Sequence, residues 1–248
     1  MQTNNSTVKV LAPGISFIIP AKNEEAYIGS TIEHILKQPA DLVKEIIVVD
    51  NNSIDRTSEV AARYPKVKVL KETVSGTNRT RQRGVDVATG DILAFIDADN
   101  WLAENWSEVA LSYLTQPGVV AVAGVYRYRD VGPIGRWFTL YGFLLVAYPV
   151  YWLVHYILRK GSVVQGGNLA VWRSALQRIG GLDINYVFYG DDVNTGKQLR
   201  KIGKVLFTHK LVTLSSARRF KKNGYFATVS RYFLNFVWVI FFNRPFAK

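Results

Sequence analysis

Short apolar runs that end in polar residues recur through the first hundred positions of this chain. The runs predicted as strands are Ile15–Ile19, Glu45–Val49, Val67–Leu70 and residues 91–96. Between them, apolar residues fall at helical spacing, as at Ile28, Ile32 and Ile35. Strands that alternate with helices predict an α/β fold with a mostly parallel central sheet flanked by helices.

The ends of these strands carry the first candidate chemistry. Pro20, Asp50 and Asp97 each follow a predicted strand, and the carboxyl ends of parallel strands share the sheet edge where open α/β folds bind ligands. Asp97 and Asp99 alternate along an extended chain, so they point to the same side. Two carboxylates there suit Mg²⁺ or Mn²⁺ that holds a diphosphate. The alternative is that one of them caps the next helix while the other is solvated.

The second half of the chain has less regular patterns. Predicted strands are Val119–Val125, Val205–Thr208 and Leu211–Leu214, and the stretch Val163–Trp172 contains Gly166-Gly167-Asn168. Asp191 and Asp192 open a predicted helix, and helix capping is the structural alternative to a catalytic role for this pair. Asn168 follows two glycines, so it either contacts a ligand or is a turn residue.

Composition narrows the function classes. The chain has 248 residues and a formal net charge of +12, which indicates anionic partners such as phosphate-bearing ligands, nucleic acid or acidic lipid headgroups. It contains no cysteine, which excludes disulfides and thiolate metal sites. No G-x-G-x-x-G follows the first strand and no G-x-x-x-x-G-K-S/T occurs, which weighs against dinucleotide dehydrogenases and P-loop NTPases. The polar N-terminus predicts no signal peptide.

Several short stretches, taken in order, resemble family 2 glycosyltransferases of the GT-A fold. They are Ile18–Glu25, Val48–Thr57, Arg81–Gly84, Ala88–Asp91, Phe95–Asp99, Gly180–Asp183 and Gly190–Asp192. Their order and spacing over residues 15–205 carry the resemblance. It implies a crevice for a nucleoside diphosphate sugar at the carboxyl edge of the sheet.

The resemblance also implies roles for the residues at the nucleotide. It places Pro20, Ala21 and Glu24 against the nucleoside. It places Asp50 at the base or ribose, and Arg81 at the base or phosphate.

Four carboxylates receive roles in the same way. Asp97 and Asp99 match the Asp-x-Asp that holds ribose, metal and diphosphate, with Asp99 the more direct ligand. Asp192 matches the catalytic base, and Asp191 takes the place of a more usual Glu. Direct displacement needs one base and inverts the anomeric centre, whereas double displacement also needs a placed nucleophile. No separate nucleophile candidate is present, so we expect inversion.

Three further candidates come from charge and side-chain chemistry. Arg218 and Arg219 either clamp the diphosphate or belong to a solvated or lipid-facing charge cluster. His209 is either a further metal ligand or a structural residue.

The apolar segment over residues 136–160 raises the question of topology. Trp137–Leu158 is long enough to span a bilayer. A single span would place Asp99 and Asp192 on opposite sides of the membrane, which a shared site excludes. We therefore expect an interfacial helix, a re-entrant hairpin that turns near Pro149, or a core element. The many aromatic residues of the segment favour the headgroup region.

The C-terminal extension, residues 218–248, carries seven basic residues and no acidic one. Its apolar stretch, Tyr232–Phe242, is too short to span a membrane, but its cationic flanks suit the surface of an anionic leaflet. The alternatives are packing on the catalytic domain or a dimer interface.

These patterns predict a catalytic domain over residues 1–217 that is followed by the extension. The expected activity is metal-dependent, inverting transfer of a sugar from a nucleoside diphosphate sugar, with UDP favoured, to a hydroxyl or phosphate acceptor, for which a lipid-linked glycan is a candidate. We expect a cytoplasmic protein, peripheral on the inner face of the cell membrane, with no nucleic-acid partner. The alternatives are a sugar nucleotidyltransferase, which would carry a Gly-rich basic loop after the first strand, and a non-enzymatic basic module that binds membranes or nucleic acid.

Overall fold

The computed structural model describes residues 12–132, 149, 152, 164–186 and 190–242. Its first half contains β1 (Ile15–Ala21), α1 (Ile28–Leu36), β2 (Val43–Asp50), α2 (Thr57–Ala62), β3 (Val67–Lys71), α3 (Thr77–Val85), β4 (Ile92–Ile96), β5 (Trp101–Leu102) and α4 (Trp106–Leu114). Its second half contains β6 (Val119–Tyr128), β7 (Asn168–Trp172), α7 (Arg173–Arg178), α8 (Asp191–Arg200), β8 (Lys204–Ser215), α9 (Arg218–Asn223) and α10 (Tyr225–Phe242).

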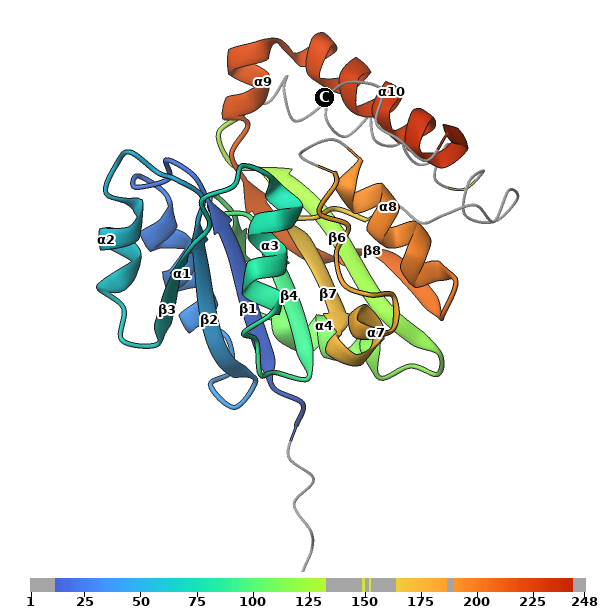
Figure 1. The fold of residues 1–248 in the computed structure, drawn as a ribbon, viewed down its shortest axis with the longest axis horizontal. Coiled ribbons are helices and arrows are strands. Elements are labelled where there is room, and N and C mark those ends of the chain that lie inside the picture. Colours follow the sequence, from blue (N-terminus) through green and yellow to red (C-terminus); the bar gives the residue numbers. More distant parts are fainter. Residues whose placement is uncertain (1–11, 133–148, 150–151, 153–163, 187–189, 243–248) are drawn as a thin grey trace, which may run out of the picture.

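The described strands form one mixed sheet in the order β3-β2-β1-β4-β7-β6-β8-β5, with helices on both faces (Figure 1). Strands β3, β2, β1 and β4 are parallel to one another. Strand β7 is antiparallel to both β4 and β6, so β6 runs in the same direction as β4. The carboxyl ends of β1, β4 and β6 therefore reach the same edge of the sheet. The predicted α/β fold is confirmed.

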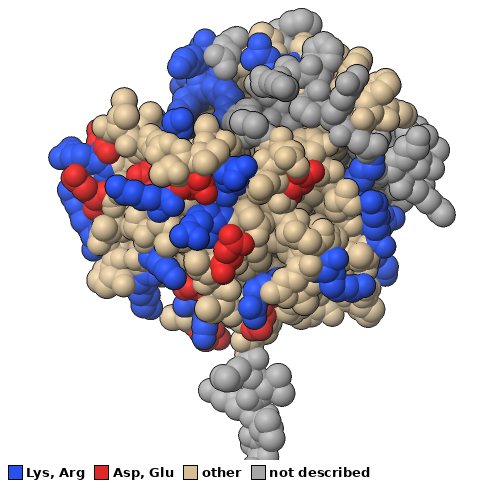
Figure 2. Space-filling model, viewed as in Figure 1, with Lys and Arg blue, Asp and Glu red and all other residues tan. Residues whose placement is uncertain are grey.

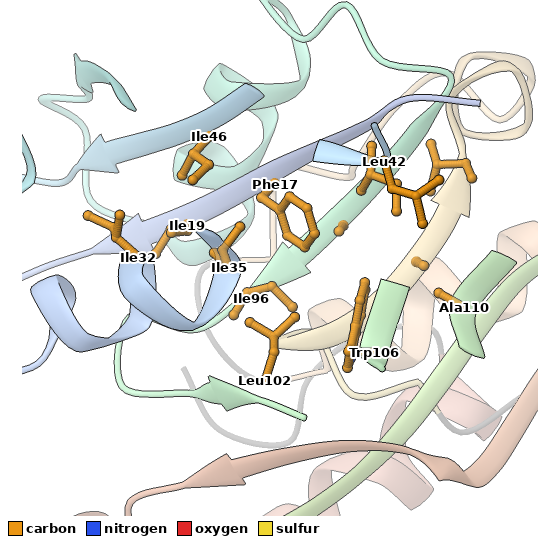
Figure 3. Packing of buried hydrophobic residues seen from close by; sticks show 14 of the residues in the cluster. Phe17, Ile19, Ile32, Ile35, Leu42, Ile46, Ile96, Leu102, Trp106 and Ala110 are labelled. Carbon is orange, nitrogen blue, oxygen red and sulfur yellow. The ribbon is translucent and has the colours of Figure 1, made fainter. Parts of the chain in front are cut away.

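Strand β1 buries both of its faces, as its continuous apolar run predicts. Phe17 and Ile19 join the core on the side of α1 and α4, whereas Ile18 packs into a second core on the opposite side of the sheet. Figure 3 shows Phe17 beside Trp106, whose ring centroid is 5.8 Å away. Both aromatic side chains are fully buried. Truncation of either to alanine is expected to cost about 3–5 kcal/mol, so this core holds the strand ends in place.

Several predicted strand boundaries are wrong. Strand β8 is continuous from Lys204 to Ser215, because its pairing with β6 shifts register and the chain bulges where the apolar pattern breaks. Strand β6 continues past Val125 to Tyr128, and the short strand β5 is not predicted by the sequence pattern.

The C-terminal extension is helical. Helix α10 packs against α8 and α9, at the edge of the sheet where the strands end (Figure 1). No helix among the described residues is both long and apolar enough to cross a bilayer. The segment 136–160 lies almost wholly outside the described residues, so its predicted placement stays a prediction.

Candidate active site

A cavity of about 690 Å³ lies at the carboxyl edge of the sheet. Its walls come from the loops after β1, β2 and β4, the start of α3, the end of β6, the glycine turn before β7, the start of α8, and the helices α9 and α10. The predicted site residues that line it are Pro20, Ala21, Glu24, Arg81, Asp97, Asp99, Asp191, Asp192, Arg218 and Arg219. Residues far apart in the sequence therefore share one site.

Arg81, on α3, is buried between two carboxylates. Its Nη1 lies 2.9 Å from Oδ2 of Asp191, and its Nη2 lies 3.1 Å from Oδ1 of Asp97. Burial lowers the pKa of this guanidinium, but the charges of Asp191 and Asp97 outweigh burial and leave the pKa raised. Loss of one member of a buried ion pair leaves an uncompensated charge. Arg81 thus holds the carboxylate after β4 and the carboxylate at the start of α8 in one arrangement.

Two glycines allow the chain to pass directly against these charged groups. A Cβ atom on Gly167 would lie 2.1 Å from the carboxylate of Asp97, and one on Gly166 would lie 2.8 Å from Nη1 of Arg81. The N–H of Gly167 donates to the hydroxyl of Tyr126 at 3.0 Å, and that hydroxyl donates to Oδ2 of Asp97 at 3.4 Å. Because a side chain would overlap the carboxylate, this turn requires glycine.

Asp191 and Asp192 form the first turn of α8. Gly190 precedes them with a φ of 79°, a conformation that glycine adopts without strain. Asp191 is paired with Arg81, whereas Asp192 accepts a hydrogen bond from the N–H of Val193 at 2.8 Å. Burial, followed by the charge of Asp191, raises the pKa of Asp192 to about 7. A carboxylate with such a pKa is suited to accept a proton near neutral pH.

Arg218, the first residue of α9, bridges two carboxylates on the opposite wall. It is ion-paired with Glu24, and its Nε lies 3.2 Å from Oδ2 of Asp99. Its guanidinium carbon lies 4.7 Å from the ring centroid of Tyr27, a cation–π contact. Burial and then the charge of Asp97 raise the pKa of Asp99, while Arg218 lowers it. Arg218 therefore balances negative charge that is concentrated at this wall.

The order of these elements along the chain matches a known family. The sequence profile of glycosyl transferase family 2 matches residues 16–180, which is more than half of the chain. The chain belongs to glycosyltransferase family 2. The expected family and the expected enzyme class are confirmed.

Related glycosyltransferases share long stretches of this sequence. The glycosyltransferase AglE of Haloferax volcanii is 27% identical over 217 residues, which cover 84% of this chain and 68% of AglE. The putative glycosyltransferase EpsH of Bacillus subtilis is 32% identical over 103 residues, which cover 40% of this chain and 30% of EpsH. The match thus spans about two thirds of AglE but less than one third of EpsH.

Solved structures share the fold. The mannosyltransferase PcManGT from Pyrobaculum calidifontis, in complex with GDP-Man and Mn²⁺, superposes with a TM-score of 0.69 at 23% identity, over 91% of this chain and 65% of that chain. Glucosyl-3-phosphoglycerate synthase from Mycobacterium tuberculosis, in complex with Mn²⁺, UDP-glucose and phosphoglyceric acid, gives a TM-score of 0.65 at 23% identity, over 95% of this chain and 82% of that chain. The predicted GT-A fold is confirmed.

Three candidate residues of this family 2 glycosyltransferase lie outside the set that lines the cavity. Asp50 accepts a hydrogen bond from the N–H of Ser53 at 2.9 Å and another from the hydroxyl of Ser58, so it orders the loop after β2. His209 is exposed at the bulge of β8. Neither side chain reaches the Asp97–Asp99 pair in this arrangement.

Asn168 is a core residue rather than a turn or ligand residue. Its Oδ1 accepts a hydrogen bond from Nε1 of Trp106 at 2.8 Å, and its Nδ2 donates to the carbonyls of Val125 and Leu211, each at 3.0 Å. The side chain is fully buried, so its amide ties β7 to α4, to β6 and to β8. A buried amide with this many partners is a structural crosslink.

Tyr126 and Tyr128 are site residues that the sequence pattern missed. Both line the cavity and lie on β6 beyond Val125, where the predicted strand ended. Because β6 runs parallel to β4, its carboxyl end reaches the same edge as Asp97. Extension of the strand by three residues, through its aromatic alternation, would have brought both tyrosines to the site.

The carboxylates of the cavity suit a divalent cation. Asp97 and Asp99 stand together, and Oε2 of Glu24 is buried without a hydrogen-bond partner. Among the described residues, no group of three or more His, Cys, Asp or Glu side chains is placed to hold a metal by itself. One or two carboxylates completed by substrate phosphates and water are the usual ligands of Mg²⁺ in nucleotide sites. The donor set therefore fits a cation that binds together with a diphosphate.

Proposed function

We propose that this protein transfers a sugar from a nucleoside diphosphate sugar to a hydroxyl or phosphate group of an acceptor, with inversion at the anomeric carbon and with Mn²⁺ or Mg²⁺ at Asp97 and Asp99. UDP is the favoured nucleotide. The observation that carries the proposal is the Arg81 bridge, because it places the Asp-x-Asp pair and the Asp191–Asp192 pair in one cavity.

Each charged group has a task in this reaction. Asp97 and Asp99 would hold the cation, which supplies positive charge to the leaving diphosphate. Arg218 and Arg219 line the same cavity and add fixed positive charge as the sugar–phosphate bond breaks.

The acceptor side depends on the pair at the start of α8. Asp192 takes the proton of the acceptor hydroxyl, and its raised pKa makes this transfer favourable near neutral pH. Asp191 is held by Arg81, so its carboxylate is not available as a nucleophile. One base without a nucleophile supports a single displacement, which inverts the anomeric centre.

Two neighbouring folds support the donor and metal parts of the proposal. PcManGT binds GDP-Man with Mn²⁺, and the mycobacterial synthase binds UDP-glucose with Mn²⁺. Both structures are 23% identical to this chain and hold different sugar nucleotides, so they support a sugar nucleotide donor in general.

Thermal unfolding with Mn²⁺ and each of UDP, GDP, CDP and dTDP tests the proposal. A ligand that binds the native state stabilises it by RT ln(1 + [L]/Kd). We expect one nucleotide to raise Tm only when Mn²⁺ is present, and Asp99→Ala to abolish the increase. Asp192→Asn should keep the increase but lose nucleoside diphosphate release from the matching sugar nucleotide. If no nucleotide stabilises the protein, the proposal fails.

A further inference from the structure

Helix α10 buries Thr228, Asn235 and Val239 and exposes several large apolar side chains. Thr228 and Asn235 are buried, and each donates a side-chain hydrogen bond to a backbone carbonyl four residues earlier, at 2.8 Å. By contrast, Leu234 and Phe242 are 42% and 55% exposed, and Phe241 is 50% exposed. The exposed face of a helix on a water-soluble surface is usually polar, so the exposed apolar side chains of α10 are suited to an apolar environment.

Basic side chains lie at the start of the same extension. Figure 2 shows Lys and Arg side chains gathered over α9, which contains Arg218, Arg219, Lys221 and Lys222. The sequence from Arg218 to the last residue has no Asp or Glu. This excess of positive charge is complementary to an anionic surface.

Both helices also line the cavity. Arg219 and Phe220 of α9 and Asn235 of α10 belong to its wall, together with Asp192. A surface that covers the exposed side of α10 would therefore lie beside the acceptor side of the site.

We propose that α9 and α10 dock on an anionic phospholipid bilayer, with the exposed side of α10 in the headgroup region, and so present the active site to an acceptor carried by that membrane. The identity of the acceptor rests on the proposed glycosyl transfer, whereas the docking does not. Docking joins two contributions, apolar contact by Leu234 and Phe242 and electrostatic attraction by α9.

Vesicle sedimentation tests the docking with the full chain. We expect the protein to sediment with phosphatidylcholine vesicles that contain 30% phosphatidylglycerol at low salt, and not with pure phosphatidylcholine vesicles. High salt should weaken binding, because it screens the attraction between α9 and the lipid. Absence of binding to the anionic vesicles would overturn the proposal.

Matched variants separate docking from general adhesion of a basic protein. Lys222→Glu is expected to weaken partitioning roughly 25-fold, since it changes the charge by two units and each charge near an anionic surface contributes about a factor of five. Lys66→Glu makes the same charge change at an exposed site after α2 and should have much less effect. Leu234→Ser with Phe242→Ser should also weaken binding, whereas Ile54→Ser, at a side chain 94% exposed elsewhere, should not. Equal loss in the paired variants would contradict docking through α9 and α10.

Two further measurements distinguish membrane docking from dimerisation and from failure of the proposed function. If light scattering shows a dimer that Leu234→Ser with Phe242→Ser converts to a monomer, the exposed side of α10 is an interface between copies and the membrane proposal is wrong. Stabilisation by nucleotide and Mn²⁺, measured on the same variants, reports on folding and on the proposed function. Retained stabilisation without vesicle binding rejects only the docking, while vesicle binding without stabilisation rejects only the proposed function.

Discussion

Arg81 and Arg218 are two arginines that each bridge two carboxylates in one cavity, but in different surroundings. The Arg81 side chain is 7% exposed and joins Asp97 to Asp191, whereas the Arg218 side chain is 39% exposed and joins Asp99 to Glu24. A buried ion pair cannot be replaced by water, while a half-exposed one exchanges with solvent and ions at little cost. The comparison indicates that the Arg81 side of the site is a fixed frame and that the Arg218 side is adaptable.

The largest expected effect comes from Arg81→Gln. Removal of the guanidinium leaves the Asp191 side chain, which is 7% exposed, buried without its partner, so the free energy of unfolding should fall by about 3–5 kcal/mol. Urea denaturation measures this change. Arg83→Gln, an exposed change on the same helix, should stay within about 0.5 kcal/mol of the wild type. An equally small loss of unfolding free energy for Arg81→Gln would mean that the ion pairs of Arg81 do not stabilise this side of the site.

A pH series on the wild type and Asp192→Asn comes next. The pKa of Asp192 is about 7 in the folded protein, whereas in the unfolded chain it lies near its ordinary acidic value. Between these two pH values the folded state therefore keeps a proton on Asp192 that the unfolded state has released. The proton on Asp192 stabilises the folded state at acidic pH, and this stabilisation is lost as the pH rises through 7. Relative to Asp192→Asn, the wild type should lose roughly 1–4 kcal/mol of unfolding free energy between pH 5 and pH 8.

Activity should change in the opposite direction over the same pH range. Only the ionised Asp192 can accept a proton, so kcat/KM of the wild type should rise as the pH approaches 7 from below. A rate that is independent of pH between 5 and 8 would argue against Asp192 as the base.

Gly167→Ala tests how closely the frame is packed. The added methyl group would overlap the carboxylate of Asp97 at 2.1 Å, so the carboxylate or the turn must move, at a cost of about 1–3 kcal/mol. Stabilisation by nucleotide and Mn²⁺ should be lost as well, because Asp97 is displaced. Gly132→Ala is the matched control, since a Cβ there would meet nothing within 4 Å.

The smallest expected change in stability is that of Arg218→Gln. The Arg218 side chain is 39% exposed, but those of Glu24 and Asp99 are 13% and 14% exposed, so we expect a loss of about 1–2 kcal/mol in unfolding free energy, more than for Arg56→Gln at the exposed pair with Glu25. Nucleotide affinity, measured by calorimetry with Mn²⁺, should nevertheless fall about tenfold for Arg218→Gln and remain unchanged for Arg56→Gln. A large loss of stability at Arg218 would remove the distinction between the two arginines.

The sequence pattern predicted those features that depend on local order. Strands β1 and β4 follow from continuous apolar runs, and Asp97 and Asp99 follow from their place after β4. Asn168 could not be assigned in this way, because its amide is bound by Trp106, 62 positions away, and by Leu211. The residues next to Asn168 in the sequence give no indication of these distant partners. The two preceding glycines therefore made a buried residue look like a turn residue.

The arginine that the family resemblance placed at the base or phosphate illustrates the same limit. The sequence identified Arg81 as a site residue, and the structure adds its ion pairs with Asp97 and Asp191. These pairs depend on tertiary packing between α3, the end of β4 and the start of α8. The charge of a residue and its position in a motif can identify it as a site residue, but its ion-pair partners depend on the tertiary structure.

The pairing of Arg218 with Glu24 also has a consequence for how the enzyme is made. The two residues are 194 positions apart, and Arg81 and Asp191 are 110 apart. Contacts between such distant parts of a chain form late in folding, because the loop between them must first be closed. During synthesis the β1 loop and Asp99 emerge long before Arg218, so the charge balance of the cavity is reached only after α9 has left the ribosome. A chain that ended before α9 would therefore leave Glu24 and Asp99 without their arginine partner, and sugar transfer would begin only in molecules whose synthesis has passed that point.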